Sequence, residues 1–188
     1  AAHEHEDCDF LEPDPQVLEE MARCGVVRYD FPAMFAQLDW TPEFEREWLD
    51  LVGATAEEGE RLIRVADDYR DDLFAKLEAI GREVGVEPWG TDVTLLTVVI
   101  ELSKAVGDDE VAAASRRVAQ ERAGLAEPPA SLEGLPVAER FLREFSDVGG
   151  AFEERITQEL GAARAHELRV ARDGWPGLKY QTGARCPD

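Results

Sequence analysis

Apolar residues recur at steps of three and four along much of this chain, which is the spacing of one face of an α-helix. The clearest example opens at Thr55 and ends before Gly85. Thr55 and Glu58 have the spacing of a capping box, and glycine is a common residue just after a helix end. The apolar positions between them form a single stripe: Leu62, Ala66, Tyr69, Leu73, Leu77, Ile80 and Val84. The pattern predicts one long helix from 55 to 84.

Capping residues, prolines and glycines predict further helices on both sides of this one. A proline-rich stretch from Leu125 to Pro136 is expected to be a loop. The expected helices cover residues 14–24, 30 to about 38, 41–53, 108–123, 137–160 with a kink at Gly149-Gly150, and 162–172.

The segment from Asp92 to Val106 is ambiguous, because its apolar residues leave almost no polar face. A short apolar run of this kind can be a buried strand or a buried helix. A single strand would have no partner in a chain that is otherwise helical. We therefore expect a central buried helix here, with a strand as the alternative.

Together these elements predict an all-α fold, a single-domain helical bundle of about six to eight helices with an extended C-terminal tail. We expect three parts. A polar acidic segment covers 1–13, the bundle covers 14–172, and a tail rich in glycine and proline covers 173–188.

Charge narrows the partners that the protein can bind. The 188 residues carry a formal net charge of −21. A nucleic-acid partner needs a basic face, so this class is excluded, and an anionic membrane surface would repel the chain. No apolar run approaches the roughly 18 residues that a membrane-spanning helix needs. Protein partners and self-association remain open.

The three cysteines lie near the ends of the chain, at Cys8, Cys24 and Cys186. An odd number allows at most one internal disulfide, and all three pairings are open. Cys24 follows a predicted helix and Cys186 lies in the tail, so these two are the favoured disulfide candidates. Terminal thiols of this kind, together with the small residues Ala1-Ala2, favour an exported protein, periplasmic or secreted. A cytoplasmic protein with reduced thiols is the alternative.

The N-terminal segment carries the best candidate for metal chemistry. Ala1-Ala2-His3 with a free amine has the nitrogen donors that Cu(II) prefers. His3, His5 and Cys8 offer nitrogen and sulfur ligands that suit zinc. The spacing matches no zinc signature, and the alternative is an acidic tail with no metal. Copper or zinc is therefore the candidate cofactor.

Aromatic residues gather in the first fifty positions. Such clusters usually belong to the core, and the alternative is a ligand pocket. The candidate pocket residues are Tyr29, Phe31, Phe35, Trp40, Phe44 and Trp48. To act as a catalytic base, the remaining histidine, His166, would need a partner that the sequence does not identify, and we expect it at the surface or in a helix cap.

The stretch from Leu49 to Glu58, followed by a long charged helix, resembles the helical hairpins of small periplasmic metal-stress and chaperone proteins. Those proteins carry Leu-Thr-x-x-Gln where this chain has Ala54-Thr55-Ala56-Glu57-Glu58. The resemblance covers about ten residues, and any helix start could produce it.

No nucleophile motif or phosphate-binding loop is present, so the sequence favours a protein that is not an enzyme. We expect an exported binding or interaction module that binds a metal through its N-terminal segment. The alternatives are an all-α enzyme or ligand carrier with its pocket among the aromatic residues, and a structural or assembly subunit.

Overall fold

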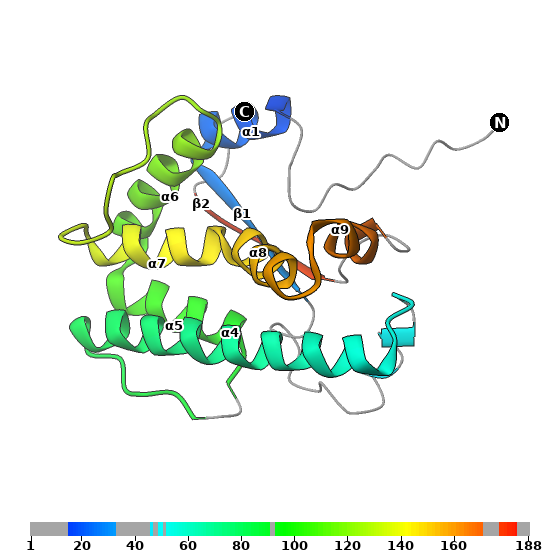
Figure 1. Ribbon diagram of the computed structural model, residues 1–188. Coiled ribbons are helices and arrows are strands. Elements are labelled where there is room, and N and C mark those ends of the chain that lie inside the picture. The colour runs from blue at the N-terminus through cyan, green and yellow to red at the C-terminus, as the bar shows by residue number, and fades with distance from the viewer. Residues whose placement is uncertain are drawn as a thin grey trace.

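A computed structural model describes most of the chain and places a long helix, α4 (Ala56–Glu83), along one side of the molecule (Figure 1). The Thr55 hydroxyl accepts a hydrogen bond from the Glu58 backbone N–H at 3.2 Å, and the Glu58 carboxylate accepts one from the Thr55 N–H at 2.9 Å. The predicted capping box is therefore confirmed. The residues described are 15–32, 46, 49–50, 52–90, 93–170 and 177–183.

Three shorter helices follow one another along α4 in the opposite direction. They are α7 (Val137–Ser146), α8 (Val148–Leu160) and α9 (Ala162–Val170). Ion pairs join α4 to each of them in reversed order, as an antiparallel arrangement requires. The pairs are Glu83–Arg140, Lys76–Glu144, Asp72–Arg155 and Glu58–Arg164.

The break between α7 and α8 lies at Asp147, so the predicted kink at Gly149-Gly150 is misplaced. Asp147 has φ −105° and ψ 0°, and its N–H donates to the Arg143 carbonyl at 3.2 Å. Its own carbonyl accepts from the Ala151 N–H at 2.9 Å. Asp147 therefore ends one helix and begins the next. The glycines continue α8, because an isolated glycine weakens a helix without having to interrupt it.

The ambiguous apolar segment is a helix, α5 (Leu95–Val106), as we predicted. The Thr94 hydroxyl caps it by accepting from the Thr97 N–H at 3.2 Å. Four of its residues are buried: Leu95, Val98, Val99 and Leu102. A methyl group added at Gly81 of α4 would lie 3.4 Å from the Leu102 side chain of α5. The glycine therefore allows the two helices to pack closely at this point.

Two strands accompany the helices. After α1 (Pro15–Cys24), β1 (Val26–Pro32) pairs antiparallel with β2 (Gly177–Gly183), and Val26 lies opposite Gly183. The expectation of a helix beginning at residue 30 is wrong for 30–32. Residues 26–31 are rich in β-branched and aromatic side chains, which favour a strand. Their partner strand, β2, was not predicted from the sequence.

The all-α fold is nevertheless confirmed, since the described residues hold seven helices and one small two-stranded sheet. Helix α6 (Asp108–Arg122) packs against α1, α5 and α7. Among the described helices, none combines the length and apolar character needed to cross a membrane.

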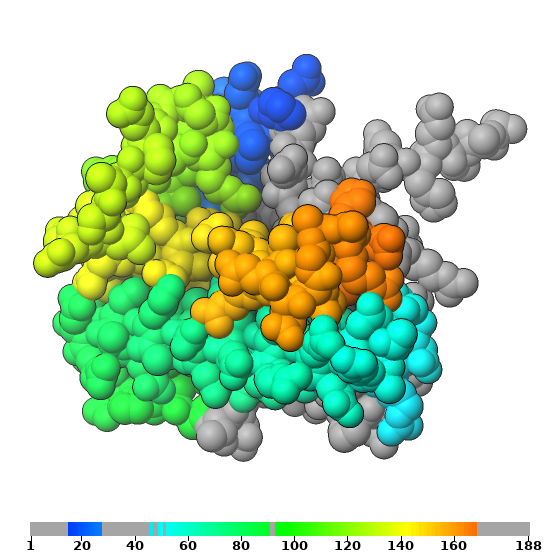
Figure 2. Space-filling model, in the orientation of Figure 1, coloured from blue at the N-terminus to red at the C-terminus, as the bar shows by residue number. Residues whose placement is uncertain are grey.

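The core is one cluster of buried residues drawn from all the described helices and from β1. At the surface, Figure 2 shows α4 meeting α7 and α8 along a continuous seam. Aromatic rings supply much of the core. The Tyr69 and Phe152 rings are 5.9 Å apart, and the Phe141 and Phe145 rings are 6.0 Å apart and nearly perpendicular. Phe145 is 1% exposed. The stripe predicted from Leu62 to Ile80 is buried, as expected.

Replacing Phe145 with alanine is expected to lower the free energy of unfolding by about 3–5 kcal/mol, because a buried ring is removed from a packed site. Leu125→Ala is the control, since Leu125 is 63% exposed, and it should change that free energy by less than about 0.5 kcal/mol. Urea unfolding followed by circular dichroism measures both. Equal losses for the two variants would contradict this account of the core.

Candidate functional site

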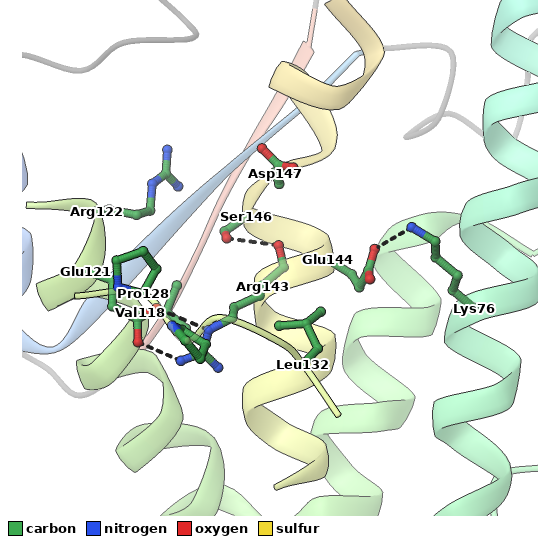
Figure 3. Close-up of a pocket in the computed structure, with 11 residues that line it drawn as sticks. Lys76, Val118, Glu121, Arg122, Pro128, Leu132, Arg143, Glu144, Ser146 and Asp147 are labelled. Carbon is green, nitrogen blue, oxygen red and sulfur yellow. Dashed lines mark hydrogen bonds and ion pairs between the residues drawn. The ribbon is translucent and has the colours of Figure 1, made fainter. Parts of the chain in front are cut away.

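One cavity of about 470 Å³ opens between α4, α6, α7 and the linker that joins α6 to α7 (Figure 3). Its lining is partly charged and partly apolar. The residues are Lys76, Val118, Glu121, Arg122, Pro128, Pro129, Leu132, Arg143, Glu144, Ser146 and Asp147.

Arg143 lines this pocket with a side chain that is 12% exposed. Its guanidinium donates two hydrogen bonds to Glu121, at 3.1 and 2.6 Å, in the bidentate geometry typical of strong arginine–carboxylate pairs. It also donates to the Glu139 carboxylate at 3.1 Å and to the Glu139 carbonyl at 2.9 Å. Arg117 donates a further hydrogen bond to Glu139. This network holds α6 against α7 and occupies the donors of Arg143 with protein acceptors.

Other polar groups of the lining also have partners. Lys76 donates to Glu144 at 3.2 Å across the gap between α4 and α7. The Ser146 hydroxyl donates to the Arg143 carbonyl at 3.0 Å. Ser146 is the lining hydroxyl, and no histidine lines the pocket to activate it.

Asp147 differs from these groups. Among the described residues, no side chain or backbone group forms a hydrogen bond or ion pair with its carboxylate. The residue is exposed as a whole. The pKa of its carboxyl is nevertheless raised, mainly by partial burial of the carboxyl group and then by the negative charge of Glu144. Arg122 and Lys76 oppose the rise.

The predicted metal ligands His3, His5 and Cys8 lie outside the described residues. In the part of the chain that is described, no group of three His, Cys, Asp or Glu side chains is placed to hold a metal ion. His166 is exposed on α9, as expected, and does not line the pocket.

The aromatic pocket predicted near the N-terminus stays a prediction. Tyr29 and Phe31 contribute backbone to β1. Phe35, Trp40, Phe44 and Trp48 lie outside the described residues.

Cys24, the last residue of α1, is disulfide-bonded. The chain has two other cysteines, Cys8 and Cys186, and both lie outside the described residues.

Arg164 ties α9 to the beginning of α4. It donates to the two carboxylate oxygens of Glu58, at 2.9 and 3.0 Å, and to the Gly53 carbonyl at 2.9 Å. The hydrogen bond from Arg164, followed by the one from the Thr55 backbone, lowers the pKa of Glu58 to about 2. The capping carboxylate is thus also the acceptor of a contact between distant parts of the chain.

Comparison with known proteins gives no relative. No family model, no curated protein and no solved structure matches this chain. The pocket must therefore be interpreted from its own geometry.

Sequence reasoning did not single out the pocket residues, because carboxylates are too abundant in this chain for pairs to stand out. One local signal was available. Glu139 and Arg143 are four residues apart, a spacing that favours an ion pair on one helix face, and Glu139 lies among apolar neighbours. A carboxylate on an apolar face usually has a buried partner.

Replacing Arg143 with methionine is expected to cost about 3–5 kcal/mol of unfolding free energy, because Glu121 and Glu139 would remain buried without their cation. Arg61→Met is the matched control. Arg61 pairs with Glu57 at the surface, so its loss should cost about 0–1 kcal/mol. Guanidinium unfolding at pH 7 tests both. A cost for Arg143→Met as small as the control's would show that the network adds nothing to stability.

The depressed pKa of Glu58 predicts a pH-dependent contribution to stability. A carboxylate with a lowered folded-state pKa stabilises the fold fully above its ordinary value near 4.5, and this contribution is lost as the pH falls toward 2. Glu58→Gln should therefore be less stable than the wild type at pH 7, and the difference should shrink between pH 4.5 and 2. Urea unfolding at a series of pH values measures it. A difference that is constant with pH would contradict the assignment.

Proposed function

We propose that this protein is a non-catalytic binding module whose pocket between α6 and α7 binds a small ligand that carries an amine on an apolar body. The observation that carries the proposal is the pairing pattern of the pocket. Lys76 and Arg143 have carboxylate partners, whereas Asp147 offers a carboxylate with no partner among the described residues. The charges of Arg122 and Lys76 act on the Asp147 carboxylate from a distance, so the carboxylate can still accept a hydrogen bond from a ligand.

The shape and lining of the pocket support this class of ligand. A volume of about 470 Å³ falls within the range of small-molecule sites. The linker supplies an apolar wall from Pro128, Pro129 and Leu132, and Val118 of α6 adds to it. Figure 3 shows Leu132 and Asp147 on different sides of Arg143, with Glu121 beside Val118 and Pro128. A ligand with an apolar body and one cationic end would place its body against the linker and its charge at Asp147.

Electrostatics favour a cationic group at Asp147. Partial burial and Glu144 both disfavour its charged form. A bound ammonium would remove that penalty through a charge-assisted hydrogen bond. The formal net charge of the chain, −21, attracts cations and raises the rate at which they encounter the protein.

The polar groups of the pocket also support binding rather than covalent catalysis. The Ser146 hydroxyl already donates to a backbone carbonyl, and the lining holds no imidazole or thiol. Arg143 is occupied by Glu121 and Glu139. These groups shape and charge the cavity without forming a nucleophile and its base.

Benzylamine is a suitable probe, and neutral benzyl alcohol is its control ligand. We expect benzylamine to bind the wild type, and to bind Asp147→Asn with an affinity about tenfold or more lower. The lost charged contact is worth about 1.4 kcal/mol or more. Asp71→Asn is the matched variant, because Asp71 is exposed on α4 and does not line the pocket. Amide chemical shifts in NMR titrations report affinity and location.

Binding should also weaken as the pH falls through the titration of Asp147, because the amine stays charged while the carboxyl becomes neutral. Equal affinity of the wild type and Asp147→Asn for benzylamine would overturn the proposal. So would equal affinity of the wild type for the amine and the alcohol.

A further inference from the structure

The corner where α1 joins β1 is tightly fixed. Gly25 lies between Cys24 and Val26, is buried, and has φ +66°, a conformation that favours glycine. A methyl group added there would lie 3.2 Å from the Arg116 Cβ and 3.5 Å from its Cα, so the turn presses against α6. Cys24 is therefore held in a defined place at the beginning of the sheet.

The register of the sheet brings the end of β2 to this same corner. Val26, the first residue of β1, lies opposite Gly183, the last residue of β2. Because the strands are antiparallel, the chain before Val26 and the chain after Gly183 leave the sheet at the same end. Cys24 is two residues before Val26, and Cys186 is three residues after Gly183.

We propose that Cys24 forms its disulfide with Cys186, and that this bond fastens the two ends of the sheet to each other. Three residues extend at most about 10 Å. A disulfide needs its two Cα atoms about 4.4–6.8 Å apart. The segment after Gly183 is therefore long enough to reach Cys24 without any change in the sheet.

The alternative partner, Cys8, requires a different path. Cys24 is at the far end of α1, which has ten residues and is about 15 Å long. Seven residues can extend over at least about 23 Å, so Cys8 is also within reach of Cys24. Fixing those seven residues costs more conformational entropy than fixing the three that follow Gly183. With Cys24 and Cys186 paired, Cys8 keeps its thiol.

The bond forms by a two-electron oxidation. The two thiols lose two protons and two electrons as the S–S bond forms. An oxidant of the disulfide class, such as glutathione disulfide, accepts them and is itself reduced to two thiols. Such bonds persist in oxidising compartments, so the pairing supports the export that the sequence suggested.

Trypsin separates the three cysteines, since cleavage after Arg23, Arg28 and Arg185 places them in peptides 1–23, 24–28 and 186–188. The full chain is refolded with glutathione disulfide and digested without reductant. We expect 24–28 joined to 186–188, with a mass two hydrogen atoms below that of the two reduced peptides together. Peptide 24–28 joined to 1–23, or recovered as a free thiol, would overturn the proposal.

Thermal unfolding gives a second readout. Cys24→Ser and Cys186→Ser should each lower Tm by about 5–15 °C. The double variant should lie no lower than either, because both changes remove one bond. Cys8→Ser is the control and should keep the wild-type Tm. Dithiothreitol should lower Tm only where Cys24 and Cys186 are both present. A larger loss from Cys8→Ser than from Cys186→Ser would overturn the pairing.

Discussion

The architecture depends on covering the apolar stripe of α4. This helix has 28 residues and is therefore about 42 Å long, with buried positions from Gly59 to Gly81. None of the other described helices is long enough to cover that length. The chain meets the requirement with α7, α8 and α9 in succession, which turn at Asp147 and Gly161 and so stay on the stripe (Figure 1). Four ion pairs join α4 to these helices in the same antiparallel order.

A buried charge network adds a second constraint, because it sets how α6 lies against α7. Arg143 and its two carboxylate partners lose water on burial, and only multiple hydrogen bonds offset that cost. The planar guanidinium can form these hydrogen bonds only when Glu121 and Glu139 have one particular placement relative to each other. Glu121 and Arg143 of this network line the pocket together with Pro128, Pro129 and Leu132 of the linker. The same interaction that orders two helices thus lines the concave surface.

Much of the fold could be predicted from local sequence patterns. The stripe of α4 and its capping box are short-range signals, and Leu95–Val106 could be assigned once its surroundings were known to be helical. The β1–β2 sheet could not, since each strand is favoured only by a partner at the other end of the chain. The break at Asp147 was missed because a single residue that caps two helices gives a weak sequence signal. The two adjacent glycines at 149 and 150 gave a stronger signal for a helix break.

The pocket was harder to predict than the helices for a related reason. Its lining comes from three helices and a linker, and each charged residue is ordinary in isolation. What distinguishes Asp147 from its neighbours is only the absence of a partner among the described residues. That property belongs to the tertiary arrangement. A composition with 41 acidic residues gives no means of selecting this carboxylate in advance.

The position of the two strands has a consequence for biosynthesis. β1 precedes α4 to α9 in the chain and β2 follows them, so β1 is synthesised well before its partner strand. All the helices from α4 to α9 are synthesised while β1 has no partner, and an unpaired strand edge is a site where chains can associate wrongly. The dense negative charge repels neighbouring copies during that interval. The sheet can therefore form only after the described helices between its two strands have been synthesised.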